Sequence, residues 1–284
     1  MRVTAARTTI AGVVTQPDRR SGRGQRLQPT PVKLAAQELG LLVCEPESLR
    51  DFAAELTDDI ALFVLASYGK ILPGSLLRLP ALGALNVHPS LLPLYRGATP
   101  LQSALREGAS QTGVTIMLMD AGMDTGDVVL QEKTPVGPNE TYGELHDRLA
   151  ELGARLLERA LEVAAAGTIV AKPQRGDPTI TRPLSKADLR LDWNWDSDRI
   201  VNTVRAFSPQ PGARADVLGV PVKIVRAVRA GASTGQPGTV LGIAGDAVTI
   251  ATGAGAVNVV SLIPANRGPM SGAAFASSFT RQTP

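Results

Sequence analysis

Two polar side chains at the end of an apolar stretch have the types and spacing of a catalytic pair. Asn86 and His88 lie two residues apart, so on a strand both side chains leave from the same face. Pro89 is expected to end that strand because it has no N–H to donate. Such a pair offers a hydrogen-bond donor and a proton carrier, although polar residues that are only hydrogen-bonded in a half-buried strand would look the same.

The loop over residues 120–127 is a second concentration of polar groups. It holds three carboxylates and two glycines, and it follows an apolar stretch over residues 113–119 that predicts a strand. The carboxylate spacing does not match a calcium-binding EF-hand. Asp120 and Asp127 are expected to accept hydrogen bonds from backbone N–H groups of the loop. With two histidines and one cysteine in the chain, we also expect no metal site.

The elements that must position these residues alternate between strand and helix over the first 170 residues. Strands are predicted at residues 10–14, 41–44, 59–65, 113–119 and 128–130, and helices at 31–39, 49–56, 102–107 and 141–167. Within the strand predicted at 59–65, residues 60–65 are apolar throughout, as expected when helices cover both faces of a sheet. Residues 15–31, rich in Gly, Pro and Arg, are predicted to be a loop. The pattern indicates an α/β domain over residues 1–170.

The remaining third of the chain has a different pattern, which predicts a linker followed by a domain rich in short strands. Residues 171–184, which are rich in proline, predict a linker. A helix is expected at 197–207, and short strands at 220–228, 238–243, 247–252 and 257–262, in a domain over residues 185–284. This spacing fits a small barrel of the oligonucleotide-binding (OB) type, a fold that often but not always binds nucleic acid.

Charge is distributed unevenly around a net value of +3. Residues 1–33 hold seven basic side chains and one acidic one, and residues 199–284 hold eight basic and two acidic. Two basic ends suit a polyanionic partner that touches the protein at two places, although an uneven solvated surface gives the same count. Cys44 is the only cysteine, which favours the cytosol. No apolar run approaches the roughly 18 residues of a membrane span.

The stretch over residues 86–100 carries a family resemblance. Asn-Val-His-Pro-Ser-Leu-Leu-Pro-x-Tyr-Arg-Gly-Ala-x-Pro resembles the formyltransferases that use 10-formyltetrahydrofolate, and among them those that formylate the methionine of initiator tRNA. Residues 15–19 with 22–24, residues 119–127 and residues 184–186 fit the same enzymes. The resemblance runs from about residue 12 to the last residues, and it implies a Rossmann-like domain with a mostly parallel sheet.

The resemblance also implies roles for individual residues. Asn86, His88 and Asp124 would be catalytic, without a metal or a covalent enzyme intermediate. The folate-binding site would be lined by Ser90, Leu91, Leu92 and Pro93. The backbone around Lys70, Ile71 and Leu72 would also contact the folate. The residues expected to contact tRNA are Arg19, Arg20, Gly22, Arg23 and Arg26. The implied partners are initiator methionyl-tRNA and the folate co-substrate, for a cytoplasmic monomer that does not bind membranes.

The beginning of the chain departs from the resembled pattern. That family opens with a strand, a Gly-Thr-Pro turn and a helix, whereas residues 1–14 have room for one strand. The first strand of such a fold is central, so we expect an exposed strand edge, lower stability and low transferase activity.

Two alternatives follow from these observations. One is an RNA-binding relative without catalysis. The other is a formyltransferase acting on a small amine such as glycinamide ribonucleotide or a sugar nucleotide, against which the Arg-rich loop and the C-terminal barrel argue.

Overall fold

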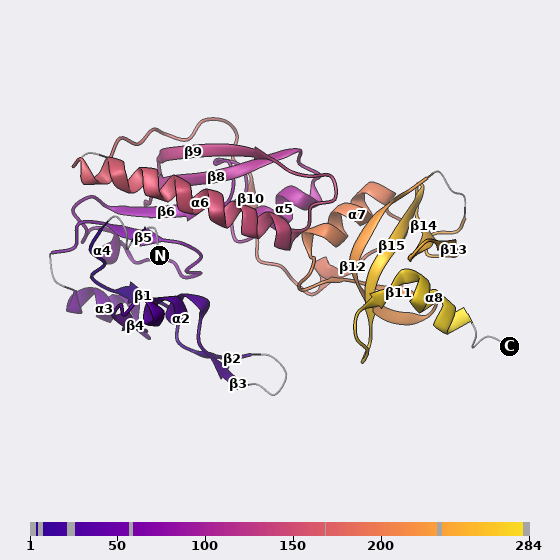
Figure 1. Ribbon diagram of the computed structural model, residues 1–284. Helices are drawn as coiled ribbons and strands as arrows, with labels where there is room; N and C mark the ends of the chain where they lie inside the picture. The colour runs from indigo at the N-terminus through magenta and orange to yellow at the C-terminus, as the bar shows by residue number, and fades with distance from the viewer. Residues whose placement is uncertain are drawn as a thin grey trace. The chain divides into compact units, whose positions relative to one another are not determined.

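The structure, a computed structural model, describes residue 4 and residues 8–21, 26–56, 59–167, 169–231 and 235–280 (Figure 1). The chain forms two compact units, and neither is continuous in sequence. Unit 1 spans residues 1–96, 113–133 and 149–179, and unit 2 spans residues 97–112, 134–148 and 180–284. The division into residues 1–170, 171–184 and 185–284 remains a prediction.

The first part of unit 1 is a small parallel strand pair with two helices. β1 (Val13–Val14) pairs with β4 (Val43–Cys44), and the helices are α2 (Pro31–Glu38) and α3 (Leu49–Glu55). Thr30 caps α2, since its hydroxyl accepts a hydrogen bond from the Lys33 N–H at 3.1 Å. Both predicted helices are confirmed.

The prediction of a plain loop over residues 15–31 is wrong in part. This segment contains β2 (Arg19–Ser21) and β3 (Arg26–Gln28), which pair antiparallel. The described side chains of the two strands are exposed. Because neither face of the hairpin packs on a core, the sequence has no apolar alternation by which a strand could be recognised.

A four-stranded sheet forms the centre of unit 1. Its order is β5-β6-β8-β9, with β5 (Phe63–Leu65), β6 (Ala84–His88), β8 (Gln111–Leu118) and β9 (Val128–Pro135). β5 and β6 are parallel, whereas β6 and β8 are antiparallel. The short helix α4 (Gly74–Leu77) lies between β5 and β6 in sequence. The α/β class is thus confirmed, and β6 places Asn86 and His88 inside the sheet.

The long helix α6 (Tyr142–Ala165) covers one face of this sheet (Figure 1). It begins with a capping box, in which the Thr141 N–H donates to Glu144 Oε2 at 2.8 Å. Its leucine stripe is buried, at Leu145, Leu149, Leu152, Leu156 and Leu161. Gly153 allows a close approach, since a Cβ there would lie 3.0 Å from Val87 Cγ1 on β6.

Within the described residues, the pair β1–β4 is not hydrogen-bonded to the central sheet, and β5 lies at one end of that sheet. The outer edge of β5, which has no strand partner among the described residues, presents backbone donors and acceptors. Such edges favour association with other chains. The expected loss of stability and activity stays a prediction.

Unit 2 is built on an antiparallel sheet in the order β11-β12-β15-β14-β13, with β16 paired to β15. The strands are β11 (Ala213–Val217), β12 (Val220–Ala230), β13 (Val240–Ala244), β14 (Ala247–Ala251), β15 (Ala256–Pro264) and β16 (Met270–Ser271). The helices are α5 (Pro100–Arg106), α7 (Ser197–Ala206), α8 (Gly272–Thr280) and the 3₁₀ helix η1 (Ala187–Leu189), and β7 (Arg96–Gly97) and β10 (Ile180–Thr181) are short strands. The four predicted strands are confirmed. β11, β16 and α8 were not predicted.

Among the described residues, no helix has the length and apolar character needed to span a bilayer.

Candidate active site

β6 holds Asn86 and His88 between two neighbouring strands. Asn86 pairs with Leu65 of β5 and Met117 of β8, and His88 pairs with Thr115 of β8. His88 is 4% exposed, whereas Asn86 is half-buried. Within the part of the chain that the structure describes, the Asn86 side chain has no hydrogen-bond partner, so its amide remains able to donate to a substrate oxygen.

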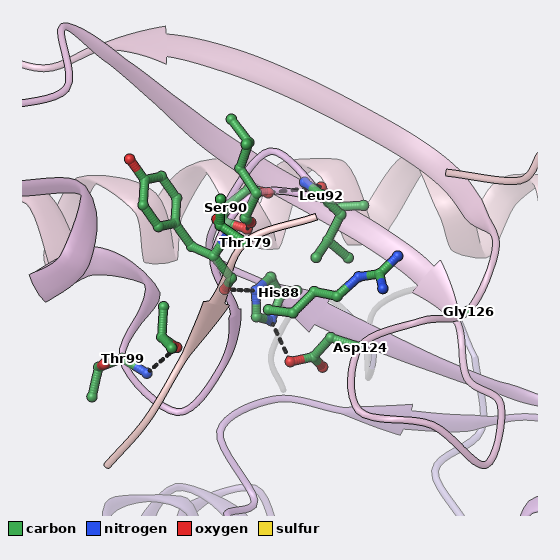
Figure 2. A network of polar contacts seen from close by, with 12 residues as sticks. His88, Ser90, Leu92, Thr99, Asp124, Gly126 and Thr179 are labelled. Atoms are coloured by element: carbon green, nitrogen blue, oxygen red, sulfur yellow. Dashed lines mark hydrogen bonds and ion pairs between the residues drawn. The ribbon is translucent and has the colours of Figure 1, made fainter. Parts of the chain in front are cut away.

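The two ring nitrogens of His88 have different neighbours (Figure 2). Nε2 lies 3.1 Å from the backbone oxygen of Tyr95, and Nδ1 lies 3.6 Å from Oδ2 of Asp124. A carbonyl oxygen can only accept, so Nε2 keeps its hydrogen and proton exchange takes place at Nδ1. The sequence-predicted His88 and Asp124 are therefore brought together, with the carboxylate at the nitrogen that can exchange a proton.

Burial lowers the pKa of His88, and the nearby Asp124 carboxylate and the Tyr95 carbonyl oppose that shift. We therefore expect the His88 imidazole to titrate below its ordinary value of about 6.5. Between the folded and unfolded pKa values the unfolded chain binds more protons, so the free energy of unfolding falls as the pH falls through this window. The measurement is an NMR titration of the imidazole signals, with His146→Gln removing the second histidine. A His88 midpoint at or above 6.5 would contradict this.

The loop that carries Asp124 is shaped by backbone constraints. Asp124 adopts a positive φ of 54°. Oδ1 of Asp120 accepts hydrogen bonds from the Gly122 N–H at 2.9 Å and the Thr125 hydroxyl at 2.7 Å, which confirms the predicted capping role. A Cβ on Gly126 would lie 1.9 Å from the Leu118 carbonyl oxygen, so only glycine fits there.

Asp127 does not have the expected capping role. Its exposed carboxylate has no hydrogen bond among the described residues, and only its backbone oxygen is used, by the Leu118 N–H.

The loop over residues 90–94 is tied to β8 through Thr115. The buried Thr115 hydroxyl donates to the Ser90 oxygen at 2.7 Å and accepts from the Leu92 N–H at 3.2 Å and from Gln131 Nε2 at 2.9 Å. The Ser90 hydroxyl donates to the Leu94 oxygen. Ser90, Leu92 and Pro93 are buried and Leu91 is half-buried. The polar backbone of Ser90 and Leu92 is thus already used within the protein.

The second predicted folate segment has a different character. Ile71 is 84% exposed, and Lys70 and Leu72 are half-buried in the connection between β5 and α4. Across the described residues, the backbone groups of these three residues make no hydrogen bond and can serve a ligand. A hollow of about 410 Å³ beside Ile71 is lined also by Ser48, Leu49, Arg50 and Pro73; His88 and Asp124 do not line it.

Three of the predicted tRNA-contact residues lie on strands β2 and β3. Arg19, Arg20 and Arg26 are exposed, and Gly22 and Arg23 lie outside the described residues. The base of the hairpin is anchored, because Lys33 Nζ lies 2.8 Å from Asp18 and 2.8 Å from Glu45. These ion pairs raise the pKa of the Lys33 ammonium group.

Several residues of the site were not found from the sequence. They are Tyr95, Thr115, Gln131, Gln174 and Thr179. Thr115 had a signal, since it is a polar residue in an otherwise apolar predicted strand. Gln174 and Thr179 had none, because they lie in a proline-rich segment without periodicity.

The comparisons with known proteins show the family of this chain. Residues 2–161 match the family described as formyl transferase, and residues 183–280 match the formyl transferase C-terminal domain. The chain belongs to the formyl transferase family.

Methionyl-tRNA formyltransferases of two Stenotrophomonas maltophilia strains, K279a and R551-3, are 46% and 45% identical over 267 residues. Each alignment covers 91% of this chain and 86% of the relative.

Solved structures share the fold at lower identity. HypX from Aquifex aeolicus, solved with tetrahydrofolic acid, is 24% identical with a TM-score of 0.66. The match covers 87% of this chain but 44% of HypX, so the chain spans less than half of that protein. An N-formyltransferase from Helicobacter canadensis, solved with folinic acid and dTDP-3-aminofucose, is 18% identical with a TM-score of 0.64, covering 86% of each chain.

Proposed function

We propose that this chain transfers the formyl group of 10-formyltetrahydrofolate to the amine of methionine on initiator tRNA, and so supports translation initiation. One observation carries the proposal: the buried His88, paired with the half-buried Asp124, follows Asn86 in a formyl transferase chain that is 46% identical to a relative named for this reaction. The proposal includes a monomeric, cytoplasmic protein whose partners are the folate co-substrate and initiator methionyl-tRNA.

The residues proposed to hold the folate fit a flat heterocycle with hydrogen-bonding edges. The backbone of Lys70, Ile71 and Leu72 supplies donors and acceptors that have no partner among the described residues. The Ser90–Pro93 loop supplies apolar side chains, and its own polar groups are satisfied by Thr115 and Gln131. When bound, the folate supplies the formyl carbon.

Each of the three candidate catalytic residues, Asn86, His88 and Asp124, has a separate role in the proposed reaction. As the amine attacks the formyl carbon, the Asn86 amide donates a hydrogen bond to the oxygen that gains negative charge. Nδ1 of His88 accepts the proton that the amine loses, and the Asp124 carboxylate stabilises the resulting imidazolium. His88 then returns the proton to the folate nitrogen, whose bond to the formyl carbon breaks.

The direct test is formyl transfer by the purified full chain. We expect transfer to initiator methionyl-tRNA, slower transfer to elongator methionyl-tRNA, and no transfer to glycinamide ribonucleotide or a dTDP-amino sugar. Preferential transfer to a small amine would establish the alternative of a small-amine formyltransferase. Binding of tRNA without transfer in a single turnover would establish the non-catalytic alternative.

We further propose that tRNA contacts the protein through the β2–β3 hairpin and the C-terminal domain over residues 185–284. Pairing across the hairpin places Ser21 opposite Arg26 and Arg19 opposite Gln28. Because cross-strand partners share a face, Arg19 and Arg26 lie on one face and Arg20 on the other. A ribbon with guanidinium groups on both faces can follow a phosphate backbone.

Removing one hairpin charge gives a quantitative expectation. Arg26→Ala should reduce the slope of log affinity for tRNA against log salt by about 0.7–0.9, the value for one lost phosphate contact. It should also weaken discrimination between initiator and elongator tRNA. The control is Arg50→Ala, which removes the same charge from α3 in the same unit. Equal slopes for Arg26→Ala and the parent would indicate a hairpin that does not touch tRNA.

A further inference from the structure

The segment over residues 174–179 contacts the surroundings of His88 and Asp124 at two points, and it belongs to unit 1 with them. Figure 2 labels Thr179, at the end of this segment, together with His88 and Asp124. Gln174 Nε2 donates to the backbone oxygens of Asp124 and Gly126, each at 2.8 Å. Gln174 Oε1 accepts from Arg96 Nε at 3.1 Å and Nη2 at 2.7 Å. The side chain therefore joins the Asp124 loop to the chain that follows the folate-lining loop.

The orientation of the Gln174 amide is determined by its partners. A guanidinium group only donates and carbonyl oxygens only accept, so the opposite orientation of the amide would place like groups together at both ends. Both hydrogens and the oxygen are used. Such a saturated group has one favourable arrangement, and it fixes the backbone on which Asp124 is carried.

At the other end of the segment, Thr179 holds the backbone of Tyr95, whose carbonyl lies at Nε2 of the His88 imidazole. The Tyr95 N–H donates to the Thr179 hydroxyl at 2.7 Å, and the Arg96 N–H donates to the Thr179 oxygen at 2.9 Å. Tyr95 has a positive φ of 59°, which is unusual for a residue other than glycine. Its carbonyl is the acceptor for His88 Nε2. The segment thus holds the acceptor at Nε2 and the backbone of the carboxylate at Nδ1.

We propose that Gln174 is a positioning residue of the formyl transfer site, which sets the placement of Asp124 against Nδ1 of His88, and that Thr179 supports the same ring through Tyr95. Gln174 acts through Asp124 and need not touch the substrate. The proposal rests on the proposed function for its kinetic consequences but not for its effect on His88. A displacement of about 1 Å at a catalytic group can cost about 10²-fold in rate.

Three substitutions separate the contacts. Gln174→Met removes both the donors and the acceptor at similar size. Gln174→Glu keeps the acceptor for Arg96 but turns an oxygen toward the Asp124 and Gly126 carbonyls. Thr179→Val removes the hydroxyl that accepts from Tyr95. The control, Gln111→Glu, makes the same chemical change at an exposed residue on β8 that has no side-chain hydrogen bond among the described residues.

We expect both Gln174 variants to lower kcat by about 10- to 100-fold, with KM for tRNA and folate changed less than about threefold. Thr179→Val should have a smaller effect in the same direction, and Gln111→Glu should match the parent. Equal loss in the two Gln174 variants would assign the effect to donation toward the loop, whereas parental kcat in Gln174→Glu would overturn that assignment.

The second readout is independent of activity. Asp124 is the charged group facing His88, and its carboxylate raises the pKa of that imidazole. Gln174→Met should therefore lower the midpoint of the His88 NMR titration, because Asp124 moves away. An unchanged midpoint with parental kcat would overturn the proposal, as would reduced thermal stability with an unchanged midpoint. A parent without transferase activity would overturn the proposed function alone, and a shifted midpoint in Gln174→Met would still support the positioning role.

Discussion

Replacing Asn86 with alanine should lower the turnover of formyl transfer by about 10²–10³-fold, the usual cost of removing one oxyanion donor. The side chain has no hydrogen-bond partner among the described residues, so its loss leaves no protein group unsatisfied and stability should change little. Binding of tRNA should remain close to that of the parent. Single-turnover rates at saturating folate measure the effect directly.

Two further variants sharpen this test. Asn86→Asp has nearly the same shape but replaces the amide donor with an acceptor, so it should be at least as slow as Asn86→Ala. Asn139→Ala, at an exposed position without a side-chain hydrogen bond among the described residues, should match the parent. Full turnover in Asn86→Ala would remove Asn86 from the chemistry.

Replacing Asp124 with asparagine should lower turnover by about 10²–10⁴-fold, the range for a group that serves proton transfer. Asparagine tolerates a positive φ as well as aspartate does, so the loop should keep its shape. The amide has no charge with which to stabilise protonated His88. The His88 midpoint should therefore fall below its parental value, because the carboxylate at 3.6 Å raises the pKa of the imidazole.

The matched control for Asp124 lies three residues away. Asp127→Asn makes the same change on an exposed carboxylate that has no hydrogen bond among the described residues. We expect parental kcat and a parental His88 midpoint. Equal losses in the two variants would mean that loop charge in general is needed, and the specific role of Asp124 would be wrong.

The sequence by itself determined the fold class, the family resemblance and the candidate triad. An apolar run over residues 60–65, a helical pattern over residues 141–167 and regularly spaced apolar strands beyond residue 220 are local patterns, and each was confirmed as an element. The spacing of Asn86 and His88 is also local, since two residues on a strand share a face. Hydrophobic burial imposes such patterns on the sequence, which is why they can be read from it.

Only the tertiary structure decided which groups surround the imidazole. The backbone oxygen of Tyr95 accepts a hydrogen bond from Nε2 of His88. The backbone oxygens of Asp124 and Gly126 accept hydrogen bonds from Gln174 Nε2. Every residue has a backbone carbonyl oxygen, so the sequence does not indicate which carbonyl accepts a particular hydrogen bond. The pairing of β2 with β3 was missed for a related reason, since two strands with both faces in solvent need no apolar alternation. Residues distant in sequence meet here through hydrogen bonds, and the folded chain alone brings them within reach.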